Sequence, residues 1–100
     1  MKERETYYSA EVLSALVSCG VGYFKFCQKT DTISIKFEKQ SKTFIIPNER
    51  IKKAVVSCKV VYSNWYYASL PKPMLFQKKV SLFRQALSPI IEEIKNESTR

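Results

Sequence analysis

The spacing of apolar residues changes twice along the chain, from helical to alternating and back to helical. Residues 6–19, and the chain from Asn48 onward, repeat their apolar positions every three or four residues, which is the period of a helix. Residues 23–46 alternate apolar and polar positions, which is the period of a half-buried strand. The pattern therefore predicts an α+β domain with the element order α-β-β-β-α-α.

The first helix is predicted from Thr6 to Cys19. Ser9 is a suitable N-cap residue, and Gly20 stands at the position where a left-handed glycine ends many helices. Four apolar residues share one face of this helix and should point to the core: Val12, Leu13, Leu16 and Val17.

Three short antiparallel strands are predicted next, at Tyr23 to Cys27, Thr32 to Lys39 and Thr43 to Ile46. Their inner face should carry Phe24, Phe26, Ile33, Ile35 and Phe37, and their outer face Tyr23, Lys25, Ser34, Lys36 and Ile45. Lysine and tyrosine on an open sheet can form a platform on which bases stack, but a solvated face is the commoner arrangement, and we favour it.

The densest apolar stretch, NERIKKAVVSCKVVYSNWYYASL, runs from Asn48 to Leu70. Its adjacent apolar pairs fit the wide face of a helix better than an alternating strand, although its β-branched residues favour a strand. Asn48 is expected as the N-cap, and Pro71 and Pro73 should end the helix. An inward stripe is formed by Ile51, Val55, Cys58, Tyr62 and Trp65 and is widened by Val56, Val60, Val61, Tyr66 and Tyr67. We therefore expect a central helix buried between two layers. The sequence does not decide whether Trp65, Tyr66 and Tyr67 all belong to the core or partly form an exposed contact patch.

A second apolar stripe follows the extended segment LPKPM, at Phe76, Val80, Phe83, Leu87, Ile90 and Ile94. It predicts a C-terminal helix that covers the central one. Pro89 interrupts the pattern, so either this helix kinks or Ser88 caps a second, short helix. Packing on the central helix is favoured for this stripe, and a homodimer through it is the alternative.

Length and composition indicate one domain over residues 1–100. The chain has 45% hydrophobic residues, and no apolar run reaches the roughly 18 residues that a membrane span needs. The first residues, MKERETYY, lack the apolar stretch of a signal peptide, so we expect a cytoplasmic protein.

The residue inventory argues against catalysis. There is no histidine, Asp31 is the only aspartate, and no phosphate-cradling glycine loop is present. Cys19, Cys27 and Cys58 are odd in number and lack the CxxC spacing of zinc sites, so we interpret them as small core residues. We expect a non-catalytic binding protein that needs no metal and no cofactor.

Charge is the strongest clue to a partner. The chain has 17 lysine and arginine residues against 9 aspartate and glutamate residues, a net charge of +8 that favours anionic partners. The start of the central helix and the preceding hairpin carry the candidate nucleic-acid site, which could merge into one surface: Lys36, Lys39, Lys42, Arg50, Lys52, Lys53 and Lys59. A weaker cluster is Lys72, Lys78, Lys79 and Arg84. An acidic protein surface is the alternative partner, and an ordinary solvated face is the alternative to any site.

Two families resemble parts of this pattern. The order helix, three strands, helix from Ser9 to about Tyr62 resembles the double-stranded-RNA-binding domain. That resemblance implies phosphate contacts from Lys52 and Lys53 and a contact from Glu11 on the first helix. The strands ISIKF and TFI and the pair Asn64-Trp65 are similar to small phage anti-CRISPR inhibitors. This second resemblance implies a protein from a phage or mobile element that inhibits a host defence nuclease through protein contact.

Overall fold

The computed structural model of the chain describes residues 8–98 and has the predicted α+β architecture. The order α-β-β-β-α-α is confirmed, with one additional single-turn helix between the last two long helices. The elements are α2 (Ala10–Ser18), β1 (Val21–Cys27), β2 (Thr32–Phe37), β3 (Phe44–Pro47), α3 (Asn48–Tyr62), α4 (Trp65–Ala68) and α5 (Lys72–Ser98).

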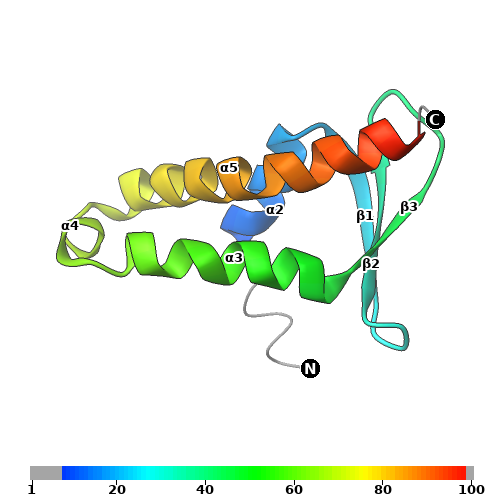
Figure 1. Cartoon of the computed structure of the whole chain (residues 1–100). Coiled ribbons are helices and arrows are strands. Elements are labelled where there is room, and N and C mark those ends of the chain that lie inside the picture. Colours follow the sequence, from blue (N-terminus) through cyan, green and yellow to red (C-terminus); the bar gives the residue numbers. More distant parts are fainter. Residues whose placement is uncertain (1–7, 99–100) are drawn as a thin grey trace.

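The sheet lies at one end of the molecule, and α3 and α5 extend from it side by side to α4 at the other end (Figure 1). The helix α2 packs against α5 near the sheet. One core joins these elements, and its largest fully buried side chains come from all the layers: Val12, Leu16, Val21, Ile33, Ile35, Ile46, Ile51, Leu87 and Ile91.

The three strands form an antiparallel sheet in the order β1-β2-β3. The predicted faces are confirmed on β2, where Ile33, Ile35 and Phe37 are buried. On β1 the inner face is only partly covered. Phe26 remains exposed, and its ring packs at a tilt of 51° against that of Tyr8, with 4.6 Å between ring centroids. The strand ends differ from the predicted ones by one or two residues, which is the usual uncertainty of a boundary.

The cap predictions for the first helix are confirmed. Ser9 is the N-cap, and its hydroxyl accepts a 3.4 Å hydrogen bond from the Val12 amide. Gly20 has a φ of +99°, a conformation that favours glycine. Val12 and Leu16 are buried as expected, but Val17 is exposed, so its predicted place in the core was wrong. The predicted residues Thr6 and Tyr7 lie outside the described part of the chain.

The central helix ends earlier than predicted. It stops at Tyr62, and Asn64 then caps the short helix α4 by accepting a 3.1 Å hydrogen bond from the Tyr67 amide. The same side chain donates to the Val61 carbonyl at 2.9 Å, which closes the end of α3. Trp65 therefore does not continue the inward stripe and is 80% exposed. A local capping residue has overridden the apolar spacing.

The prediction that α3 lies buried between two layers was also wrong. Its buried apolar residues are Ile51, Val55 and Cys58, which form one narrow face toward the other helices. The residues expected to widen this face are largely in solvent, because none of the described elements covers the opposite side. Val56, Val60, Val61 and Tyr66 are all exposed, and Val60 is 81% exposed.

Asn48 is the first residue of α3 and not its N-cap, which is Pro47. Its buried side chain connects three segments of the chain instead. The carbonyl oxygen accepts a 2.8 Å hydrogen bond from the Tyr8 hydroxyl, and the amide donates at 3.0 Å to the Asp31 carboxylate. Asn48 therefore fastens the start of α3 to the turn between β1 and β2.

The C-terminal helix α5 is continuous through Pro89, so no second helix begins at Ser88. Pro89 is exposed, which lets solvent reach the carbonyl that loses its helical donor. Phe83, Leu87 and Ile94 are buried against α2 and α3, as the packing interpretation predicts. The stripe fails at Phe76, which is exposed. Ile90 is half-buried and Ile91 is buried in its place.

All three cysteines are free thiols, and their surroundings differ. Cys58 is buried, as predicted, and its Sγ lies 3.5 Å from the Ala54 carbonyl oxygen. Cys19 and Cys27 are only half-buried, so the interpretation of all three as core residues was wrong for these two. Each lies at the end of an element, where fewer neighbours cover it.

Candidate nucleic-acid interface

The structure distributes the predicted basic residues over three places. Lys36 lies on the outer face of the sheet, with its ammonium 5.5 Å from the ring centroid of Tyr23. Lys39 and Lys42 lie in the loop that enters β3, whereas α3 begins at the opposite end of that strand. Lys42 covers the ring of Phe44 at 5.3 Å. The hairpin therefore does not bring these lysines to the start of α3, and the expected single basic surface does not form.

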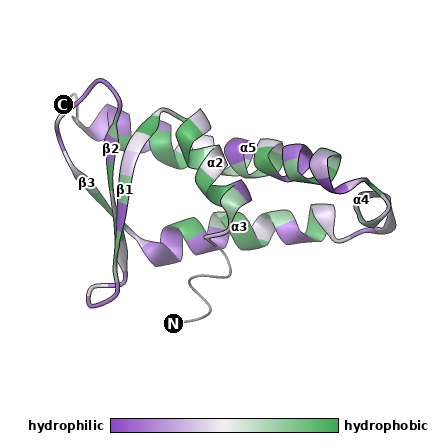
Figure 2. Cartoon of the chain, turned by 180° about the vertical axis from the view of Figure 1, so that it is seen from behind, coloured by the Kyte–Doolittle hydropathy of each residue, from purple (hydrophilic) through white to green (hydrophobic). Residues whose placement is uncertain are grey.

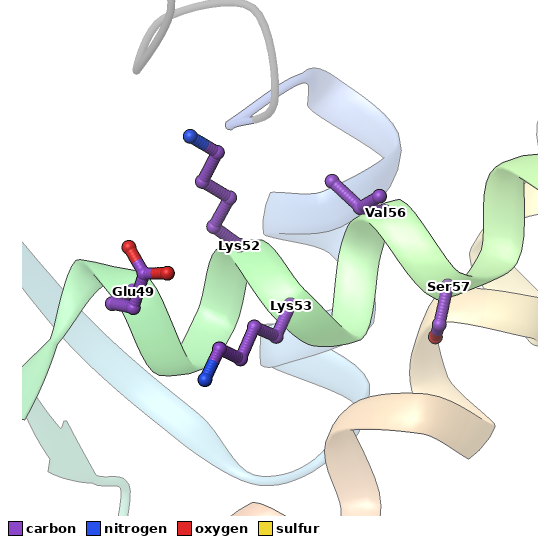
Figure 3. Close-up of a pocket in the computed structure, with 5 residues that line it drawn as sticks. All are labelled: Glu49, Lys52, Lys53, Val56 and Ser57. Carbon is purple, nitrogen blue, oxygen red and sulfur yellow. The ribbon is translucent and has the colours of Figure 1, made fainter.

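The predicted residues of α3 also point in different directions. Lys52 and Lys53 line a shallow depression of about 340 Å³, with Glu49, Val56 and Ser57, and Figure 3 shows the two lysines leaving the helix on different sides. Arg50 points to α5, where its guanidinium lies 2.9 Å from the Glu93 carboxylate. All five residues of the depression come from one helix, so this is an open face of α3 and not a clamp for one phosphate.

Charge is separated strongly along the chain. From Arg50 to Ile91 there are eight basic residues and no acidic one, so this stretch carries a charge of +8, equal to that of the whole chain. The remainder has nine basic and nine acidic residues. We call this stretch, from Arg50 to Ile91, the basic hairpin. It comprises nearly all of α3, all of α4 and the greater part of α5. Figure 2 shows its hydrophilic segments among apolar ones on both long helices.

The outer end of the basic hairpin has no core. None of the residues 59–82, which we call the distal tip, has a buried side chain. The two helices still touch there, since Tyr62 meets Phe83 edge-on with 5.8 Å between centroids and the Lys79 ammonium lies 4.7 Å from the Tyr62 ring centroid. Several large apolar side chains of the tip are exposed: Val60, Val61, Trp65, Tyr66, Met74 and Phe76.

The turn that presents these aromatic residues is well ordered by hydrogen bonds. Asn64 bonds both α3 and α4, and the Ser69 hydroxyl donates to the Tyr66 carbonyl at 2.7 Å. Trp65 meets Tyr66 edge-on at 86°, and Tyr66 meets Tyr67 edge-on at 87°. Neither of these two contacts stacks a pair of rings face to face. The tip therefore holds a largely exposed tryptophan on a defined turn.

Among the described residues, four groups have a shifted pKa, and of these only Tyr62 belongs to the distal tip. Burial raises the pKa of the Cys19 and Cys58 thiols. Burial is also the main reason that the pKa of Tyr62 is raised, with smaller contributions from Cys58 and Glu11. The Thr30 hydroxyl and backbone lower the pKa of the Cys27 thiol by hydrogen bonding. These pKa shifts follow from burial or from local hydrogen bonds, and the groups concerned do not gather in one site.

Within residues 8–98, no three cysteine or acidic side chains gather in a way that could hold a metal ion. No helix in the same range is long and apolar enough to cross a bilayer. Comparison of the chain with protein-family models, with curated proteins and with solved structures finds no match. The arrangement of the residues is therefore the basis for the functional proposal.

Two features of the site were missed by reasoning from the sequence. The spacing continues the inward stripe through Trp65, and it does not decide whether Trp65, Tyr66 and Tyr67 are core or partly an exposed contact patch. The separation of charge is readable in the sequence, as a run of 42 residues from Arg50 to Ile91 without aspartate or glutamate. Only the fold shows that this run forms two neighbouring helices that extend side by side from the sheet to α4.

Proposed function

We propose that this chain is a non-catalytic, cytoplasmic nucleic-acid-binding protein that contacts phosphates through the basic hairpin. The observation that carries the proposal is the charge separation: the hairpin holds the whole net charge of +8 and no acidic residue. A segment with this excess of positive charge attracts a polyanion and releases its condensed counterions on binding.

The dimensions of the hairpin fit an extended anion. The hairpin includes residues 72–91 of α5, which correspond to about 30 Å of helix, close to the roughly 34 Å of one duplex turn. The basic residues of α5 within the hairpin lie between Lys72 and Arg84, and α3 adds further lysines beside them, so several phosphates can be contacted at once. The contacts expected for Lys52, Lys53 and Lys59 fall within the hairpin, as does Arg50, whose guanidinium lies beside the Glu93 carboxylate. Lys36, Lys39 and Lys42 lie outside it and should contribute less.

The proposal is tested with fluorescently labelled duplex DNA, duplex RNA and single strands at two salt concentrations. For about four phosphate contacts, the affinity for a duplex should fall roughly 10²-fold between 50 and 200 mM salt. The variant Lys53→Glu/Lys59→Glu should bind more weakly and with a salt slope reduced by about two.

The matched control is Lys25→Glu/Lys29→Glu. Both variants exchange two exposed lysines and change the net charge equally, but Lys25 and Lys29 lie on β1 and its turn, outside the hairpin. The control should therefore bind more tightly than the hairpin variant. Equal weakening by both variants, or no binding above background to any substrate, would contradict the proposal.

A second candidate function is inhibition of a host defence nuclease through protein contact. It is favoured by Val56, Val60 and Val61, three valines that α3 exposes to solvent, since clustered exposed apolar residues mark interaction surfaces. Binding to such a partner should change little with salt, because apolar contact dominates it. Salt dependence therefore separates the two functions.

A further inference from the structure

We infer that the distal tip binds unpaired bases, which stack on Trp65 while neighbouring lysines contact the phosphates. This inference rests on the nucleic-acid-binding function proposed above and adds the class of ligand, single-stranded segments. Sequence-tolerant single-strand binding needs a positively charged surface and accessible aromatic faces, and the tip supplies both.

The first argument is the placement of Trp65. It is 80% exposed, although burial of a tryptophan side chain is one of the largest apolar gains available to a fold. The turn is not simply frayed, because Asn64 and Ser69 hydrogen-bond α4 from both sides. Nothing in the described chain stacks on the indole, since its Tyr66 contact is edge-on at 86°. The ring is thus held in place with a face open to a ligand.

The second argument is the charge around this ring. Lys59 lies in the last turn of α3, just before α4, and Lys72 begins α5 just after α4. Lys78 and Lys79 follow on the next turns, and the tip contains no acidic residue. The nearby cations are thus all lysines, which are depleted in protein–protein interfaces but are common phosphate ligands. Charge complementarity therefore favours a nucleic-acid strand over a protein as the occupant.

The chain offers a direct probe, because Trp65 is its only tryptophan. Stacking with a base should quench its fluorescence, and a duplex bound through phosphates alone should not. We would titrate the full chain with an oligothymidine of about 15 nucleotides and with a duplex of equal length. Fluorescence would be followed together with the anisotropy of a label on the nucleic acid. Quenching by the single strand only is the expected result.

Two substitutions then separate stacking from apolar contact. Trp65→Leu keeps an apolar side chain but removes the aromatic face, and should weaken single-strand binding about tenfold while leaving duplex binding unchanged. Trp65→Phe retains a smaller aromatic face and should recover most of the affinity. Tyr23→Leu is the control, because it removes an exposed aromatic ring from the outer face of the sheet and should have no effect.

The inference is overturned if Trp65→Leu binds single strands as well as the wild type, as it would if the tip served apolar protein contact. It is also overturned if anisotropy reports binding without quenching, or if Trp65→Leu weakens duplex and single strand equally. In each of these cases the proposed nucleic-acid function survives. Absence of any binding to both ligands would instead overturn the proposed function, and the inference with it.

Discussion

The two ends of the molecule differ in how many apolar side chains they bury. The sheet, α2 and the adjoining halves of α3 and α5 share one continuous core, and that core includes sixteen buried hydrophobic residues. The distal tip, residues 59–82, has no buried side chain, yet it exposes a tryptophan and several other large apolar residues. The comparison indicates that stability resides at the sheet end and that the tip is available for binding.

The largest expected difference between the two ends is in stability. Leu87 is fully buried, so Leu87→Ala should lower the free energy of unfolding by about 2–5 kcal/mol. Trp65→Ala removes a larger side chain but should change the free energy of unfolding by no more than about 0.5 kcal/mol, because the indole ring is in solvent. Urea denaturation followed by circular dichroism measures both values. A similar loss in the two variants would show that the tip is packed after all.

The two asparagines at the starts of helices give a smaller contrast of the same kind. Asn48→Ala removes a buried side chain that bonds Tyr8 and Asp31, and should cost about 1–3 kcal/mol. Asn64→Ala removes an exposed cap of a single-turn helix and should cost about 1 kcal/mol or less. Thermal unfolding of both variants measures the difference. If Asn64→Ala proved the more damaging, the tip would contribute to global stability.

The smallest expected effect concerns thiol reactivity within the core-bearing end. Hydrogen bonds from Thr30 lower the pKa of Cys27, so more thiolate is present at neutral pH, and this residue should react first with iodoacetamide. Burial raises the pKa of Cys58, which should react last. Thr30→Val should raise the pKa of Cys27 and slow its labelling a few-fold at pH 7. Peptide mapping by mass spectrometry identifies each site, and unchanged labelling of Cys27 would exclude a role for the Thr30 hydroxyl.

Much of the fold could be predicted because its signals are local. Ser9 and Gly20 mark the ends of α2, and the alternation of Ile33, Ile35 and Phe37 identifies both a strand and its buried face. The predictions became wrong where an apolar side chain has no partner to cover it. Periodicity shows that Val60 and Trp65 could share a face with neighbours, but it cannot show whether another layer exists there.

The candidate site was predicted only in part. Lys52, Lys53 and Lys59 lie on the basic hairpin, whereas Lys39 and Lys42 lie at the far end of β3, because the direction of a strand decides which loop adjoins a helix. Arg50 was expected to face an anion, but it lies beside Glu93, a residue 43 positions later in the sequence. Contacts of this range depend on how α3 and α5 pack together.

The sequence by itself determined the class of fold, the order of its elements and the stretch that carries the net charge, since periodicity, capping and composition are properties of neighbouring residues. The tertiary structure decided which apolar residues are covered. The distal tip has no core, because α2 and the sheet contact only the half of α3 and α5 nearest to them. Burial depends on which elements meet, and for this reason Trp65, the last residue of the predicted inward stripe, is in solvent.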